Sequence, residues 1–197
     1  YKSILECLSQ AATYNDCKVK THFIQSENLT RDNIADNLSL MDGIVICPGF
    51  GQRGTEGKIV AAEYCRTHDV PTLGICLGMQ MMVIEFARNV LGLENANSRE
   101  MDPSTPHNVI DLMEEQKSIT QMGGTMRLGA YSCELSTGSK VFEAYGKSHI
   151  EERHRHRYEF SSPYRRQFEQ AGMLCTGINP DSGLVEIVEI PACRWYV

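Results

Sequence analysis

Hydrophobic residues follow two different spacings in the first part of the chain. In four segments they recur every three to four positions, as on one face of a helix. In two others they form short unbroken runs, typical of strands buried on both faces of a parallel sheet. A further strand is predicted where Val19 and Phe23 alternate with polar residues. The predicted helices span residues 2–12, 30–40 with Thr30 as the cap, 55–68 and 78–91, and the predicted strands span 18–24, 42–47 and 70–75.

Beyond about residue 100 the pattern changes to short strands joined by turns. No linker rich in Gly, Ser or Pro separates the two halves, so we expect them to share one core. The strand–helix alternation of the first half indicates right-handed crossovers onto a parallel sheet. The expected fold is therefore α/β, with an open mixed, mostly parallel sheet, helices on both of its faces and a smaller antiparallel portion. In the second half the predicted strands span 108–113, 126–135, 151–160, 173–178 and 184–189, with a helix at 162–171.

The composition fits one globular domain with an acidic surface. Of the 197 residues, 42% are hydrophobic and 22% are charged, which is enough apolar surface to offset the entropy of the chain. Acidic residues outnumber basic ones by 25 to 19, giving a net charge of -6. Such a chain would repel a phosphate backbone, so we expect no nucleic-acid partner. The apolar runs are far shorter than the roughly 20 residues of a spanning helix, so we expect no membrane segment.

One of the eight cysteines stands in an unusual context. No two of them form a CxxC pair, so we expect reduced thiols and a cytoplasmic protein. Seven are interpreted as small buried hydrophobes. Cys76 differs because GICLGMQ places it between Gly74 and Gly78, where a predicted strand meets a predicted helix. This arrangement is typical of a nucleophile elbow, in which the start of the helix favours a thiolate and the amide of Leu77 can hold an oxyanion.

A glycine-rich segment, PGFGQRGTEGK at residues 48–58, follows the other buried strand. It does not fit the phosphate-binding Walker A order, because Ile59 rather than Ser or Thr follows Lys58. Glycines here would let the backbone pass close to a substrate bound at Cys76 and present N–H groups to an oxyanion. A flexible surface loop is the alternative interpretation.

Six segments together resemble one family. GICLGMQ, PGFGQRGTEGK, ENANSRE, MGGTMRLGAYSCEL, ERHRHRYEF and LVEIVEIP are similar to segments of the glutaminase domains of CTP synthases, a group of class I (triad) glutamine amidotransferases. The similarity runs over almost the whole chain, and the last four segments are not shared by amidotransferases in general. The resemblance implies a flavodoxin-like three-layer fold. It also implies that glutamine is hydrolysed through a glutamyl thioester and that the ammonia serves the ATP-dependent amination of UTP to CTP.

The resemblance also implies roles for individual residues. Cys76 would be the nucleophile, and the amides of Leu77 and Gly49 would bind the oxyanion. Pro48 stands where many relatives have a glycine, and because Pro has no N–H, the donor from this loop would have to be Gly49 or its neighbour. Glu100 and Arg157 offer an acceptor for the ammonium and a fork of donors for the carboxylate of an amino acid. The implied glutamine-binding residues are Gly49, Phe50, Leu77, Gln80, Glu100, Arg157 and Tyr158.

The implied partners are L-glutamine and a synthetase domain of the same polypeptide, in a homotetramer. No cofactor is expected in this domain, whereas the full enzyme would use ATP and Mg, with GTP as an allosteric activator. Residues 52–58 resemble the family's lid segment, which is associated with activation by GTP. The first strand of the fold and the family's catalytic His and Glu are not among residues 1–197, so we expect an incomplete triad here. Without an imidazole base a thiol is mostly protonated at neutral pH.

Four alternatives stay open. In ERHRHRYE a period of two places His154 and His156 on one face of a strand and three arginines on the other. The histidines suggest a metal site that lacks a third ligand, and the arginines suggest a surface for a polyanion; we rank both below glutamine recognition and expect no metal. At the level of function, the alternatives are another Cys-dependent γ-glutamyl hydrolase and a non-catalytic module that binds glutamine or a nucleotide.

Overall fold

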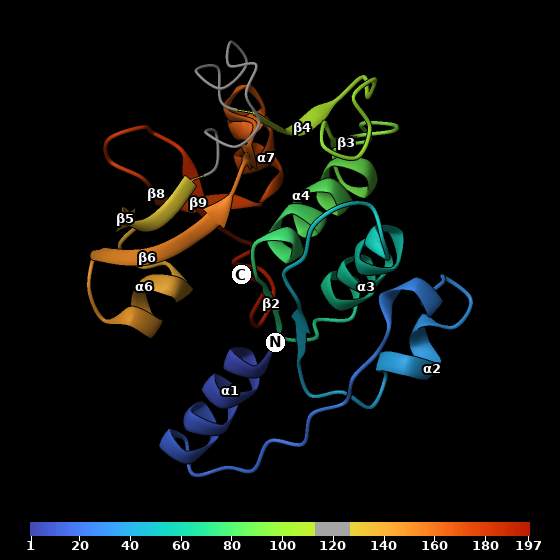
Figure 1. The fold of residues 1–197 in the computed structure, drawn as a ribbon, viewed down its shortest axis with the longest axis vertical. Coiled ribbons are helices and arrows are strands. Elements are labelled where there is room, and N and C mark those ends of the chain that lie inside the picture. The colour runs from blue at the N-terminus through green and yellow to red at the C-terminus, as the bar shows by residue number, and fades with distance from the viewer. Residues whose placement is uncertain (113–126) are drawn as a thin grey trace.

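The computed structural model describes residues 1–112 and 127–197 (Figure 1). Met113 and Met126, at the ends of two predicted strands, and the start of the MGGTMRLGAYSCEL motif lie outside the described residues. The helices are α1 (Lys2–Tyr14), η1 (Ser26–Asn28), α2 (Ile34–Leu38), α3 (Thr55–Thr67), α4 (Leu77–Asn89), α6 (Lys140–Tyr145), η3 (Ser162–Tyr164) and α7 (Arg165–Ala171). The strands are β1 (Ile44–Ile46), β2 (Thr72–Gly74), β3 (Asn97–Ser98), β4 (Asn108–Leu112), β5 (Arg127–Leu135), β6 (His149–His156), β7 (Tyr158–Phe160), β8 (Leu174–Ile178) and β9 (Val185–Glu189).

The described strands form three sheets. β1 and β2 are parallel, and Tyr196 adds a parallel bridge to Thr72 of β2. β4 pairs parallel with β3 and antiparallel with β7. The third sheet, in the order β6-β5-β8-β9, is antiparallel throughout. The α/β class and the antiparallel second half are confirmed, but the expectation of one mostly parallel sheet is wrong for the described residues. Short connections, such as the turn between β8 and β9, join antiparallel neighbours, whereas a parallel pair needs a long crossover.

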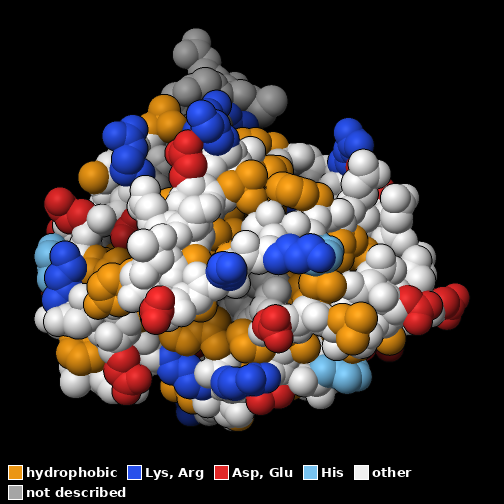
Figure 2. All heavy atoms as spheres, turned by 90° about the horizontal axis from the view of Figure 1, so that it is seen from below, with side chains coloured by type: hydrophobic (Ala, Val, Ile, Leu, Met, Phe, Trp, Pro, Cys, Tyr) orange, Lys and Arg blue, Asp and Glu red, His pale blue; other side chains and the backbone are white. Residues whose placement is uncertain are grey.

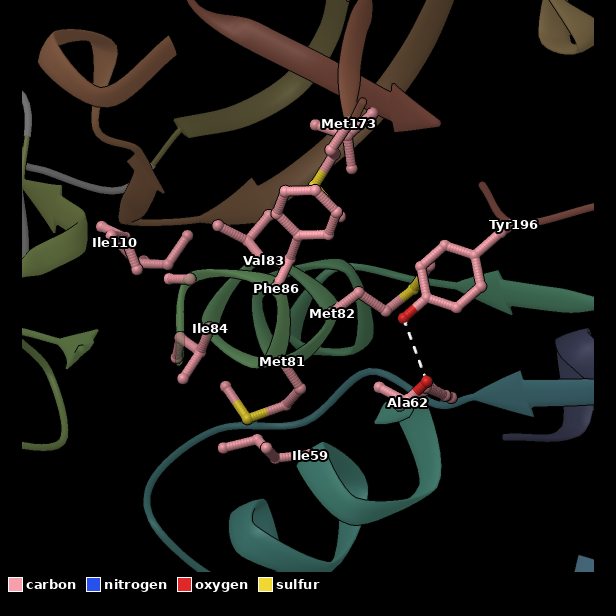
Figure 3. Close-up of a cluster of buried hydrophobic side chains, with 14 of the residues drawn as sticks. Ile59, Ala62, Met81, Met82, Val83, Ile84, Phe86, Ile110, Met173 and Tyr196 are labelled. Carbon is pink, nitrogen blue, oxygen red and sulfur yellow. Dashed lines mark hydrogen bonds between the residues drawn. The ribbon is translucent and has the colours of Figure 1, made fainter. Parts of the chain in front are cut away.

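Helix α4 lies at the centre of the molecule, with α3 on one side and strands of the second half on the other (Figures 1 and 3). Four consecutive residues of α4, from Met81 to Ile84, are completely buried, so this helix is packed on every side, and its buried Glu85 pairs with Arg66 of α3. In Figure 3 Met81 points toward Ile59 of α3, and Val83 lies on the opposite side of the helix. The sequence pattern of residues 78–91 predicts this central helix to within two residues at each end.

Several predicted elements differ from the structure. Residues 18–24 form no strand; Phe23 is 76% exposed, and no described strand pairs with this segment. The helix predicted from Thr30 begins only at Ile34, with Asn33 as its cap residue, because residues 31–33 form a turn. β3 and α6 were not predicted; the Ser139 hydroxyl caps α6 by accepting a hydrogen bond from the backbone amide of Phe142. Local spacing is a weak guide for elements this short.

The single strand predicted over 151–160 is two strands that meet at Arg157. The first, β6, pairs with β5 in the four-stranded sheet. The second, β7, pairs with β4 in the three-stranded sheet. The chain therefore passes from one sheet to another at Arg157, one of the residues implied to bind glutamine.

No helix among the described residues has the length and hydrophobicity needed to cross a bilayer. On the face seen in Figure 2, Lys and Arg side chains are scattered among acidic and hydrophobic ones. This face therefore carries no continuous basic surface of the kind that a phosphate backbone would require.

Candidate active site

Cys76 occupies a strained turn between β2 and α4. Its backbone has φ 56° and ψ −108°, a conformation that residues other than Gly rarely adopt. The flanking glycines are required by packing: a Cβ on Gly78 would lie 1.9 Å from the carbonyl oxygen of Ile46, and a Cβ on Gly74 would lie 2.2 Å from the sulfur of Met82. The nucleophile-elbow geometry expected from GICLGMQ is thus present.

The thiol of Cys76 is half-buried, and its pKa lies above the usual value. Burial is the main cause, and the negative charge of Glu100 adds to it. The Leu77 amide, which donates to the sulfur, and the ammonium of Lys58 act in the opposite direction but do not outweigh burial. The Leu77 amide at the start of the helix therefore favours the thiolate, as the sequence predicts, but burial has the larger effect on the pKa. The thiol needs a base before it can act as a nucleophile.

The glycine-rich loop after β1 lies against the elbow. A Cβ on Gly49 would be 3.2 Å from the end of the Leu77 side chain, which would have to shift slightly, and 3.5 Å from the ammonium of Lys58, an ordinary contact. Lys58 donates a hydrogen bond of 2.7 Å to the carbonyl oxygen of Cys47, and the hydroxyl of Tyr1 donates one of 2.7 Å to the carbonyl oxygen of Pro48. These two contacts hold the segment that precedes Gly49. The position of the loop favours its interpretation as part of the site over a flexible surface loop.

Cys76 opens onto a cavity of about 80 Å³. All the residues implied to bind glutamine line it, except Leu77, whose side chain is buried but whose amide faces the thiol. His156 lines the cavity and Lys58 acts on the charge of the thiol, and neither was predicted as a site residue, although the loop that contains Lys58 was expected to lie near Cys76. The cavity is lined by Gly49, Phe50, Cys76, Gln80, Glu100, His156, Arg157 and Tyr158.

Elements distant in sequence hold the cavity walls. The side-chain amide of Gln80, on α4, donates a hydrogen bond of 3.0 Å to the carbonyl oxygen of Tyr158, which ties the helix of the elbow to β7. The backbone amide of Glu100 donates to the hydroxyl of Ser98 at 3.2 Å, which fixes the turn that follows β3. Arg157 is brought to the cavity by the break between β6 and β7. A larger cavity, of about 710 Å³, lies against β4 and η3 and does not include Cys76.

The site combines a thiol, an adjacent helix-start amide, and one acidic and one basic side chain, which is the chemistry of a hydrolase for a small amino acid. The family model "Glutamine amidotransferase class-I" matches residues 1–196. The chain therefore belongs to the class-I glutamine amidotransferases.

Individual relatives narrow the assignment. The CTP synthase of Bacteroides fragilis is 68% identical over all 197 residues, and that of Porphyromonas gingivalis is 61% identical over the same length. The solved structure "Trypanosoma brucei CTPS - glutaminase domain with bound acivicin" has a TM-score of 0.93 and 33% identity, and the match covers 100% of this chain and 77% of that one. Within its class, the chain belongs to the glutaminase domains of CTP synthases. It spans 37% of the length of the B. fragilis relative and 36% of that from P. gingivalis.

Proposed function

We propose that this chain hydrolyses L-glutamine through a glutamyl thioester on Cys76 and that it supplies ammonia to a synthetase domain. The observation that carries the proposal is the convergence of Cys76, Glu100 and Arg157 on one small cavity. Glu100 and Arg157 carry opposite charges, which suits the ammonium and the carboxylate of a free amino acid. A cavity of about 80 Å³ that places both charges near the thiol favours a single small substrate over a peptide.

In the proposed reaction the Cys76 sulfur attacks the side-chain carbonyl carbon of glutamine. The developing oxyanion receives hydrogen bonds from the amide of Leu77, which already faces the sulfur, and from that of Gly49 across the cavity. The tetrahedral intermediate collapses, the C–N bond breaks and ammonia leaves with the proton that the thiol has lost. Water then attacks the thioester, which releases glutamate and returns the thiol.

The base for this thiol is assigned to the family's triad His, held by a Glu, which the resemblance places beyond residue 197. The raised pKa of Cys76 supports this assignment, since the surrounding groups do not ionise the thiol by themselves. Lys58 would help once the proton is removed, because its ammonium lies near the thiol and lowers the pKa. The ammonium thus stabilises negative charge on the sulfur without acting as the base.

The activity of the whole protein is also a proposal. Because the chain spans little more than a third of its CTP synthase relatives, we assign ATP- and Mg-dependent amination of UTP to a synthetase domain outside residues 1–197. In this proposal GTP activates the enzyme through the lid at residues 52–58, and the polypeptide forms a cytoplasmic homotetramer. The side chains of Gln52 and Arg53 contact Met101 and Glu27, so the lid segment is tied to neighbours on both sides.

The direct test is ammonia release from glutamine by the full-length protein. Cys76→Ala should abolish it, whereas Cys7→Ala, which changes an exposed cysteine on α1, should leave it intact. A diazo-ketone analogue of glutamine should alkylate Cys76 alone, with loss of N₂, and add the mass of the reagent less that of N₂. If Cys76→Ala releases ammonia at the original rate, the nucleophile is misassigned; if γ-glutamyl peptides are cleaved faster than free glutamine, the γ-glutamyl hydrolase alternative is correct. Tight glutamine binding without hydrolysis would indicate a regulatory module instead.

A further inference from the structure

A group of mostly buried ionisable side chains lies beside the candidate active site, under strand β6. It joins residues from four strands, β5, β6, β7 and β9. Their side chains are between 3% and 16% exposed. We call this group the His–Glu cluster; its members are Arg127, His154, His156, Glu159 and Glu186.

The contacts within the His–Glu cluster form a chain of partners. His154 reaches Glu186 through its Nε2 atom, 2.9 Å from Oε2, and its Nδ1 atom is 2.6 Å from Nε2 of His156. Nδ1 of His156 lies 3.1 Å from Oε1 of Glu159, without the alignment of a hydrogen bond. Arg127 contacts both carboxylates, at 2.8 Å to Oε1 of Glu186 and 3.2 Å to Oε1 of Glu159. Its guanidinium also lies over the ring of Tyr131, at 4.1 Å from the centroid.

The charges of the His–Glu cluster do not balance when both histidines are neutral. Glu159 and Glu186 supply two negative charges, and Arg127 supplies one positive charge. An uncompensated buried charge is costly, so the cluster favours one further cation.

We propose that His154, His156 and Glu186 bind a divalent transition-metal ion of the Zn²⁺ class. One ligand atom from each lies within 4.8 Å of the others. Two imidazole nitrogens with one carboxylate oxygen form a donor set that Zn²⁺ commonly accepts, with a fourth position open to water. Each imidazole binds one ion through a single nitrogen, and the 2.6 Å and 2.9 Å contacts use different nitrogens of His154. If His154 binds through Nδ1, its 2.6 Å contact with Nε2 of His156 must widen to the roughly 3.3 Å between neighbouring tetrahedral ligands at about 2.0–2.2 Å from zinc, and the Glu186 carboxylate must move toward the ion from within 4.8 Å.

The surroundings are those of a supported metal site. Arg127 contacts Oε1 of Glu186, while Oε2 of the same carboxylate faces His154. Glu159 lies against Nδ1 of His156, while Nε2 of the same ring faces His154. Such outer contacts orient metal ligands in known sites. The sequence showed the two histidines on one strand face but offered no third ligand. Folding supplies it from β9, 30 residues further along the chain.

A single proton shared by the two histidines would balance the same charge, and this is the competing explanation of the His–Glu cluster. The ion would act beside the glutamine cavity, because His156 lines that cavity next to Arg157. Its binding does not depend on the proposed glutaminase activity, and the test below measures the ion itself.

The test is a titration of the metal-depleted full-length protein with Co²⁺, followed by visible absorption. We expect a band set of nitrogen and oxygen ligation without thiolate charge transfer. His154→Gln and Glu186→Gln should each weaken this binding at least tenfold, whereas His149→Gln, an exposed histidine of the same strand, should leave it unchanged. Absence of these bands, thiolate bands alone, or equal affinity in His154→Gln would overturn the proposal.

Because Glu186 is buried, its variant can fail for structural reasons. A second measurement therefore uses the unsubstituted protein: anomalous diffraction from a crystal soaked in Co²⁺. A peak among His154, His156 and Glu186 is expected. Ordered cobalt found only elsewhere, or none, would favour the shared proton and refute the metal site.

Discussion

The strained backbone conformation of Cys76 should lower the free energy of unfolding of the protein, and two substitutions isolate this effect. Cys76→Ala and Cys76→Gly both remove the thiol, so neither should release ammonia from glutamine. They differ because alanine must keep the strained φ of 56°, whereas glycine adopts it freely. Cys76→Gly is therefore expected to be the more stable variant, the reverse of the usual order.

The magnitude follows from three terms. A residue held in a sparsely populated backbone region costs about 1–3 kcal/mol. Glycine loses about 0.4–1 kcal/mol through the greater freedom of its unfolded chain. The missing Cβ removes at most about 0.8 kcal/mol of burial, and roughly half of that at a half-buried position. The net advantage of Cys76→Gly is about 1 kcal/mol, a shift of roughly 0.3–1 M in the urea midpoint.

The assay is urea unfolding of both variants of the 197-residue chain, followed by the fluorescence of Trp195, its single tryptophan. The same pair of substitutions at Cys7, an exposed position within helix α1, provides the control. There Cys7→Gly should be less stable than Cys7→Ala by about 1 kcal/mol. A midpoint for Cys76→Gly at or below that of Cys76→Ala would refute the argument that the elbow stores strain.

Three other outcomes follow from the same geometry. Gly78→Ala should destabilise the chain by about 1–3 kcal/mol in urea unfolding, because its Cβ would meet the carbonyl oxygen of the last residue of β1. Gly43→Ala, whose Cβ would make only ordinary contacts, should leave the stability nearly unchanged. Equal effects of the two substitutions would contradict this prediction. The ammonium of Lys58 lowers the pKa of the Cys76 thiol and the carboxylate of Glu100 raises it. Lys58→Met should therefore move the pH midpoint of Cys76 alkylation upward, and Glu100→Gln should move it downward. Mass spectrometry of the modified peptide measures both midpoints, and shifts of the opposite sign would be inconsistent with the site. Burial raises the pKa of three other thiols to about 11 or 12, so in the folded protein at pH 8 they should resist the same reagent, and their modification before unfolding would show that the core is open. These thiols are Cys65, Cys133 and Cys175.

Much of the first half could be predicted because its elements are determined by local patterns. The apolar runs predict β1 and β2 at the right places, but burial on both faces is wrong for β2, where Leu73 is 39% exposed. Helix α4 is mostly apolar because it is packed on every side. The wrong elements were those with little burial to fix them. Residues 18–24 alternate as a strand would, yet their side chains are mostly exposed, so no packing holds them in one.

The sequence by itself determined the chemistry of this protein: a cysteine between two glycines at a strand end, and the residue types suited to a free amino acid. The tertiary structure alone decided their arrangement. The alternation over 151–160 cannot show that the strand breaks at Arg157, because the break depends on which neighbouring strand each half pairs with. The same pairing brings Glu186 to His154, since contacts between strands depend on register and not on distance along the chain.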